Sequence, residues 1–170
     1  MRRGEVLGLT WLALDIEHGS LRVDQQLLEN GTFGPPKSRR SRRTVALDPA
    51  TVDALREHRD RQLLERAFAG PAYVDRDLVF ADALGAPIRP AKVTERFARL
   101  AGMVGLPGTL HVLRHTAATL ALTHGVPLHI VAARLGDRAE TLLGVYSHLL
   151  PTSDAEAAAQ VAALIPVSNR

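Results

Sequence analysis

The segment from residue 111 to 115, His-Val-Leu-Arg-His, has the residue types and the spacing of a site for phosphate chemistry. On a helix, His111 and Arg114 lie three residues apart and therefore share one face. A histidine transfers protons near neutral pH, and an arginine binds a phosphate through two parallel hydrogen bonds from a permanently charged fork. The spacing predicts that both side chains meet the same phosphate group.

A metal site is the alternative for this segment, because His111 and His115 lie four residues apart. A zinc-protease helix needs a glutamate at the position of Val112 as general base, and it also needs a third ligand. Valine is not a base, and the chain contains no cysteine that would bind zinc. We therefore expect neither a metal nor any other cofactor. We expect His115 to be a partly buried helix residue that bonds to a neighbour.

A tyrosine nucleophile is the second chemical possibility, and Tyr73 and Tyr146 are the only tyrosines in the chain. A phenol has a pKa of about 10, so it attacks only with the help of a nearby base. Taken alone, a tyrosine on a helix is more typical of a core residue with a solvated hydroxyl.

Positive charge gathers in one short segment of a chain whose formal net charge is only +3. Five residues between positions 37 and 43 are basic, namely Lys37, Arg39, Arg40, Arg42 and Arg43. Such a cluster is typical of a surface that binds a polyanion, although a solvated hairpin carries similar runs of charge. We refer to residues 37–43 as the basic run.

These residues are expected to lie on a mainly α-helical fold with a small antiparallel β-sheet near the N-terminus. Hydrophobic spacing predicts strands over 20–28 and 43–47 and helices over 2–14, 90–101, 109–124, 127–136, 140–150 and 153–164. Asp48 followed by Pro49 predicts the start of a further helix, which should end before Gly70. Lys37 is expected near a turn. With 170 residues, 46% of them hydrophobic, the chain has the composition of one globular domain.

Four segments resemble, in order, the motifs of the phage-integrase family of tyrosine site-specific recombinases. The segment from Arg2 to Trp11 resembles the first arginine motif, and the basic run around Lys37 resembles the lysine hairpin. Residues 111–116 resemble the His-x-x-Arg box, and residues 133–136 with 145–149 resemble the nucleophile region. The order and spacing are typical of the family and cover nearly the whole chain. The resemblance implies a single tyrosine-recombinase catalytic domain over residues 1–170.

The resemblance also implies an enzyme for site-specific DNA recombination or integration that works without a metal ion. The hydroxyl of Tyr146 would attack a DNA phosphate to form a 3′-phosphotyrosine, and a partner strand would reverse the step. Arg2 and Arg114 would stabilise the charge of the transition state, a role that fixed cations fill when Mg²⁺ is absent. His111 would take the proton of the phenol, and Lys37 would donate a proton to the leaving oxygen.

Further residues and partners follow from the same resemblance. Glu5 lies one turn after Arg2 and is implied to be an accessory residue that orients it, although an ion pair on the helix surface is an equally good interpretation. The four arginines of the basic run are expected to contact DNA. The implied partners are double-stranded DNA and further copies of this chain, assembled as a tetramer on DNA. No apolar run reaches the roughly 18 residues of a membrane-spanning helix, so we expect a cytoplasmic, DNA-associated protein.

Two features depart from the family pattern. Asp137 stands where the family usually has a histidine that donates a hydrogen bond to the phosphate, and an ionised carboxylate does not donate but repels. The segment from Asp137 to Tyr146 is also about one residue shorter than is common. The second feature is the start of the chain: it begins at its first arginine, so we expect that the DNA-clamping domain and the first helices of the catalytic domain are missing. Both features predict reduced activity.

Two other functions stay open at the level of the sequence. A non-catalytic DNA-binding remnant would keep the basic run but lose the chemistry because of Asp137 and the early start. A helical interaction module would use the alanine-rich helix predicted over 153–164 to dock on a partner.

Overall fold

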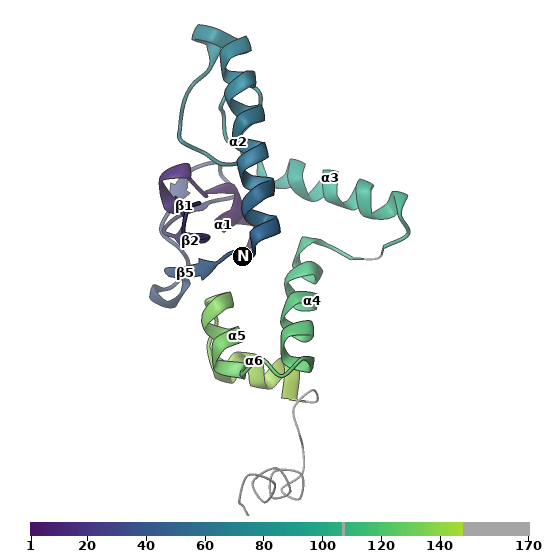
Figure 1. Ribbon diagram of the computed structural model, residues 1–170. Helices are drawn as coiled ribbons and strands as arrows, with labels where there is room; N and C mark the ends of the chain where they lie inside the picture. The colour runs from purple at the N-terminus through teal and green to yellow at the C-terminus, as the bar shows by residue number, and fades with distance from the viewer. Residues whose placement is uncertain (107, 148–170) are drawn as a thin grey trace, which may run out of the picture.

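The computed structural model describes residues 1–106 and 108–147, which form a mainly helical fold with short antiparallel strands near the N-terminus. The predicted fold class is confirmed. Figure 1 shows the sheet beside α2 (Pro49–Ala69), with α3 (Pro90–Met103) extending away from them. A separate group of helices consists of α4 (Leu110–Thr123), α5 (Leu128–Leu135) and α6 (Ala139–Tyr146). The helix predicted over 153–164 lies outside the described residues.

The first helix is much shorter than its hydrophobic spacing predicts. It is followed at once by other structure, in the order α1 (Arg3–Leu7), the 3₁₀ helix η1 (Trp11–Ala13) and β1 (Leu14–Asp15). A Cβ atom on Gly8 would lie 2.8 Å from the Cα atom of Gln26, so the chain passes the neighbouring backbone too closely for a side chain here. Beyond Gly8, the amide of Val79 donates to the carbonyl of Leu9 at 2.9 Å. Tertiary hydrogen bonds thus replace helical ones, and the prediction of a helix over 2–14 is wrong after Leu7.

A three-stranded antiparallel sheet, in the order β1-β2-β5, forms the layer against which α2 packs. Its other strands are β2 (Ser20–Val23) and β5 (Arg43–Ala46). Leu21 pairs with Leu14 on one side and with Val45 on the other, and Leu21 and Val45 are buried. The strand predicted over 20–28 breaks after Val23, and a separate two-stranded sheet follows, made of β3 (Gln26–Leu27) and β4 (Phe33–Gly34).

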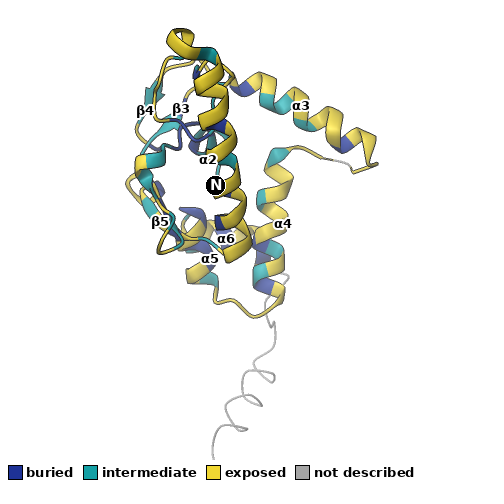
Figure 2. Ribbon diagram, turned by 45° about the horizontal axis from the view of Figure 1, so that its top comes forward, coloured by how far each residue is buried: buried dark blue, intermediate teal, exposed yellow. Residues whose placement is uncertain are grey.

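Helix α2 begins as predicted. The Asp48 carboxylate accepts a hydrogen bond from the Thr51 amide at 3.0 Å, and Pro49 occupies the first helical position. The helix ends at Gly70, whose φ of +54° favours a residue without a side chain. Most of its surface is exposed (Figure 2), and it is fixed to η1 by a hydrogen bond of 2.7 Å from Trp11 Nε1 to Gln62 Oε1.

The apolar side chains form two separate cores. The first core lies between the sheet and α2, and its buried members are Leu9, Leu21, Val23, Val45, Leu55 and Val79. The second core lies between α4, α5 and α6, and its buried members are Ala118, Leu122, Val131, Ala132, Leu135, Leu142 and Tyr146. No described residue belongs to both cores. Within the described part of the chain, no helix has the length and apolarity needed to cross a membrane.

Candidate active site

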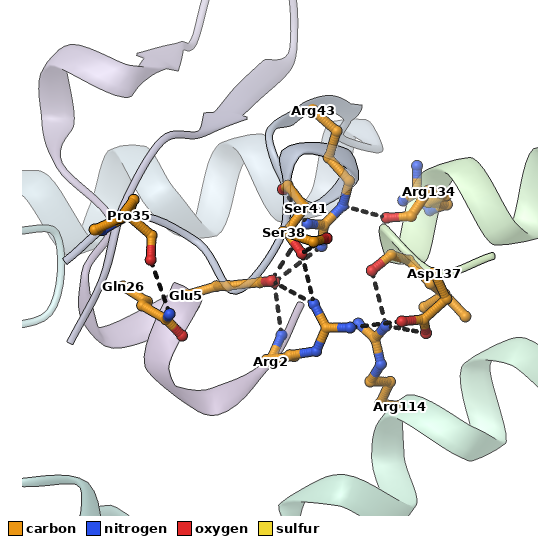
Figure 3. Close-up of polar contacts among 11 residues, drawn as sticks. Arg2, Glu5, Gln26, Pro35, Ser38, Ser41, Arg43, Arg114, Arg134 and Asp137 are labelled. Atoms are coloured by element: carbon orange, nitrogen blue, oxygen red, sulfur yellow. Dashed lines mark hydrogen bonds and ion pairs between the residues drawn. The ribbon is translucent and has the colours of Figure 1, made fainter. Parts of the chain in front are cut away.

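Arg2 and Arg114 meet at the carboxylate of Asp137 (Figure 3). Arg2 lies at the start of α1, Arg114 lies on α4, and Asp137 follows the turn at Gly136 that ends α5. Arg2 Nη2 donates to Asp137 Oδ1 at 2.5 Å, and Arg114 Nη2 donates to Asp137 Oδ2 at 2.5 Å. Each carboxylate oxygen therefore holds a different guanidinium. The structure brings together two cations that lie 112 residues apart in the sequence (114 − 2).

Glu5 holds Arg2 from the other side and is itself buried. Its side chain is only 1% exposed and accepts hydrogen bonds from Arg2 Nη1 at 3.0 Å and from Arg43 Nη2 at 2.9 Å. Burial opposes ionisation, but the hydrogen bonds from Arg43 and from the Arg2 backbone amide outweigh it and lower the pKa of Glu5. Of the two interpretations of Glu5, the geometry fits the one in which it orients Arg2.

Replacing Glu5 with glutamine is expected to reduce the free energy of unfolding by about 3–5 kcal/mol near pH 7, because the buried Arg43 guanidinium loses its counter-charge. The pKa of Glu5 is lower in the folded state than its ordinary value of 4.5. Its contribution is therefore present above that ordinary value and is lost as the pH falls through the folded value. Urea unfolding at about pH 7 and pH 3 measures both effects.

The difference between the wild type and Glu5→Gln should be large at neutral pH and should shrink in acid. The exposed Glu57 on α2 provides the matched control, and Glu57→Gln should change the unfolding free energy by less than about 0.5 kcal/mol. A Glu5→Gln effect that is equally large at both pH values contradicts the assignment of a buried, ionised carboxylate.

A pocket of about 350 Å³ opens beside the arginine pair. Arg2, Arg114 and His111 line it, together with Thr94 and Thr109. Arg114 is only 7% exposed, and its Nη1 is buried without a hydrogen-bond partner among residues 1–106 and 108–147. Two guanidiniums and an imidazole on the wall of a pocket are suited to an anionic ligand. Among the described residues, no group of three or more acidic, histidine or cysteine side chains is arranged to hold a metal ion.

Tyr146 is buried in the second core and does not line this pocket. Its hydroxyl lies 2.6 Å from Nδ1 of His115, and the His115 ring meets the His111 ring edge-on with 4.6 Å between centroids. Burial raises the pKa of the Tyr146 phenol, the charge of Arg114 opposes this shift, and the charge of Asp137 adds to it. The phenol is therefore neutral near pH 7, and its hydroxyl is paired with His115. His115 bonds to a neighbour as expected, but it is exposed and not partly buried.

The basic run is divided by the fold. Lys37, Arg39, Arg40 and Arg42 are exposed, and the 3₁₀ helix η2 (Arg39–Ser41) presents two of them. Arg43 instead turns inward, is 6% exposed and pairs with Glu5. Lys37 does not lie among the described residues that line the pocket beside Arg2 and Arg114.

Two further residues, Ser41 and Arg134, support the arginines although neither was predicted to be a site residue. Ser41 Oγ accepts a hydrogen bond from Arg2 Nη1 at 3.1 Å, and Arg134 connects the two cores. Its carbonyl accepts from Arg43 Nε at 2.8 Å, and its guanidinium donates to the Ala46 carbonyl at 2.9 Å. The only signal for Ser41 in the sequence is its position inside the basic run. The bonds of Arg134 use backbone carbonyls, which leave no pattern in a sequence.

Comparison with known proteins identifies relatives. The model of the phage integrase family matches residues 1–152. The chain is 32% identical to a tyrosine recombinase XerC-like protein of Caldanaerobacter subterraneus subsp. tengcongensis, over 89% of this chain and 43% of that protein. It is 34% identical to an integrase of Saccharopolyspora erythraea, over 67% of this chain and 26% of that protein. The chain thus spans less than half the length of these relatives.

A solved structure has the same fold. The Tn1549 transposon integrase, in complex with transposon right end DNA, superposes with a TM-score of 0.78 and 21% sequence identity. The match covers 96% of this chain and 55% of that chain. At this level of sequence identity, the similarity establishes a shared fold and nothing further.

Proposed function

The chain belongs to the phage integrase family, and from this premise we propose that it cleaves and rejoins DNA through a phosphotyrosyl intermediate on Tyr146. The observation that carries the proposal is the convergence of Arg2, Arg114 and His111 on one pocket from two separate parts of the fold. Two guanidiniums and an imidazole are the groups that a phosphate needs when its charge is stabilised without a metal ion.

In the proposed reaction, the Tyr146 oxygen forms a bond to phosphorus while the bond between phosphorus and the 5′ oxygen breaks. The phenolic proton passes to His111, and Lys37 supplies a proton to the leaving 5′ oxygen. Arg2 and Arg114 bind the non-bridging oxygens throughout. Since the hydroxyl of Tyr146 is bonded to His115 in the free protein, the attack includes a movement of this side chain from His115 into the pocket.

Covalent capture of DNA tests this proposal directly. The full chain is incubated with nicked, fragmented genomic DNA, the protein is denatured, and DNA that stays attached is sequenced while the modified residue is mapped by mass spectrometry. We expect a phosphotyrosine on residue 146 and a recurrent sequence at the cleaved end. If salt-dependent DNA binding is observed but no covalent DNA, the chain is a DNA-binding protein without the proposed chemistry.

We also propose that the partner is double-stranded DNA, that the chain acts on it as a homo-tetramer, and that it works in the DNA-associated fraction of the cytoplasm. Family membership and the exposed cations of the basic run support these statements. Light scattering of the protein with and without a captured target site measures the number of copies. A single copy on a complete target site contradicts the tetramer.

Triple replacement of Arg39, Arg40 and Arg42 with alanine is expected to weaken DNA binding and to flatten its dependence on salt. Each phosphate contact contributes about 0.9 to the slope of log K against log salt concentration, so three contacts contribute up to about 2.7. Fluorescence anisotropy with a labelled duplex at several salt concentrations gives the slope. The matched control replaces three exposed arginines of α2, Arg56, Arg61 and Arg66, and an equal loss in this control contradicts a specific role for the basic run.

A further inference from the structure

We propose that the Asp137 carboxylate is a resident counter-ion, which occupies the phosphate-binding position between Arg2 and Arg114 in the DNA-free protein and is displaced when a phosphate binds. This inference rests on the proposed function. It gives Asp137 a task that differs from that of a hydrogen-bond donor, since an ionised carboxylate only accepts hydrogen bonds.

The geometry of the carboxylate is that of a bound anion. Its two oxygens are divided between the two guanidiniums, with 2.5 Å in each contact. Two non-bridging oxygens of a phosphate would make the same pair of charge-assisted hydrogen bonds. Because two anions repel at this distance, the carboxylate and a phosphate do not share the position, and one replaces the other.

Both arginines keep other partners when the carboxylate leaves. Arg2 is held by Glu5 at 3.0 Å and by Ser41 at 3.1 Å, and Arg114 Nη2 also donates to the Leu135 carbonyl at 2.8 Å. These bonds keep the two guanidiniums in position without Asp137. Asp137 is therefore not needed to hold the two guanidiniums in position. It is needed to neutralise the two neighbouring positive charges.

The exchange needs little movement. The side chain of Asp137 is 23% exposed whereas that of Arg114 is 7% exposed, so the carboxylate is the more accessible member of the pair. The Asp137 amide is held by the Ala132 carbonyl at 3.0 Å, so the backbone stays in place while the side chain rotates.

Binding of inorganic phosphate to the full chain tests the inference without any DNA cleavage. Isothermal titration calorimetry compares the wild type with Asp137→Asn, Asp137→Glu and Asp75→Asn. Asp137→Asn removes the charge at nearly constant size, and we expect phosphate affinity to rise by about tenfold or more, since each tenfold corresponds to 1.36 kcal/mol of removed repulsion. Asp137→Glu keeps a carboxylate and should bind phosphate within about threefold of the wild type.

Asp75→Asn is the matched control because Asp75 also pairs with an arginine, Arg66 at 2.6 Å, in another part of the fold. It should leave phosphate affinity unchanged. Thermal unfolding provides a second measurement: phosphate should raise the melting temperature of Asp137→Asn more than that of the wild type. Equal phosphate affinity and equal stabilisation in the two proteins overturn the inference, and so does a loss of phosphate binding in Asp137→Asn.

The result of the phosphate-binding test can be distinguished from the result of the test of the proposed function. Phosphate binding does not require Tyr146, so a chain that never forms a covalent adduct with DNA still reports whether Asp137 competes with an anion. Conversely, formation of an adduct together with an unchanged phosphate affinity in Asp137→Asn supports the recombinase chemistry and removes the counter-ion role.

Discussion

Replacement of Tyr146 by phenylalanine is expected to abolish covalent attachment of the protein to DNA while leaving non-covalent DNA binding within about twofold. The substitution removes the oxygen that would bond to phosphorus, and loss of an enzyme's nucleophile costs on the order of 10⁴-fold or more in the chemical step. The ring itself stays in the second core, so the packing around Leu142 and Val131 is retained. Denaturing gels of a radiolabelled suicide substrate measure the adduct, and fluorescence anisotropy measures binding.

The only other tyrosine supplies the control. Tyr73 lies after α2, under the guanidinium of Arg66 at 5.8 Å from the ring centroid, and it is not part of the pocket. Tyr73→Phe should therefore form the adduct at the rate of the wild type. An adduct that persists in Tyr146→Phe, or that disappears in Tyr73→Phe, places the nucleophile elsewhere in the chain.

Replacement of Arg114 by lysine is expected to slow DNA cleavage by about 10²- to 10³-fold although the charge is conserved. The guanidinium donates both to Asp137 and to the Leu135 carbonyl, and an ammonium group does not reproduce that planar arrangement. Loss of one such preorganised donor in a buried site typically has this size of effect on the chemical step. Single-turnover cleavage of the captured target, at saturating protein, measures the rate without a contribution from binding.

Arg66→Lys is the control for this substitution, because Arg66 also forms an ion pair with an aspartate but is exposed. It should leave the cleavage rate unchanged. Circular dichroism of both variants establishes that the fold is retained. A cleavage rate of Arg114→Lys within about threefold of the wild type contradicts a role of the planar fork in the transition state.

The start signals and the apolar periods in the sequence predict most of the helices and the small sheet. Asp48 and Pro49 define the start of α2, and Gly136, with φ +70°, ends α5 where the sequence predicts. The predicted length of the first helix is wrong because its continuation depends on residues far away in the chain: the amide of Val79 donates to the carbonyl of Leu9. Hydrophobic spacing reports which face of a segment is apolar, and it carries no information about a distant backbone that competes for its hydrogen bonds.

The sequence predicted which residues form the site better than it predicted how their side chains are arranged. Arg2 and Arg114 meet at Asp137, and Glu5 contacts Arg2, whereas the catalytic and accessory roles of these residues stay predictions. The inward turn of Arg43 was not foreseen, because a run of like charges does not indicate which member faces a buried carboxylate. The pairing of Tyr146 with His115 was missed for a similar reason, since only the packing of α6 against α4 decides which of two histidines the phenol reaches.

The separation of the two cores has a consequence for how the candidate site loses its geometry. Arg2 belongs to the part of the chain around the first core, and Arg114 and Asp137 belong to the part around the second. Polar bonds join these parts, whereas each core is held internally by apolar packing. Gentle warming or moderate ionic strength would weaken the junction first. Inactivation is then expected to precede the loss of helicity, and a bound nucleic acid strand that touches both parts would protect the junction and raise the temperature of inactivation.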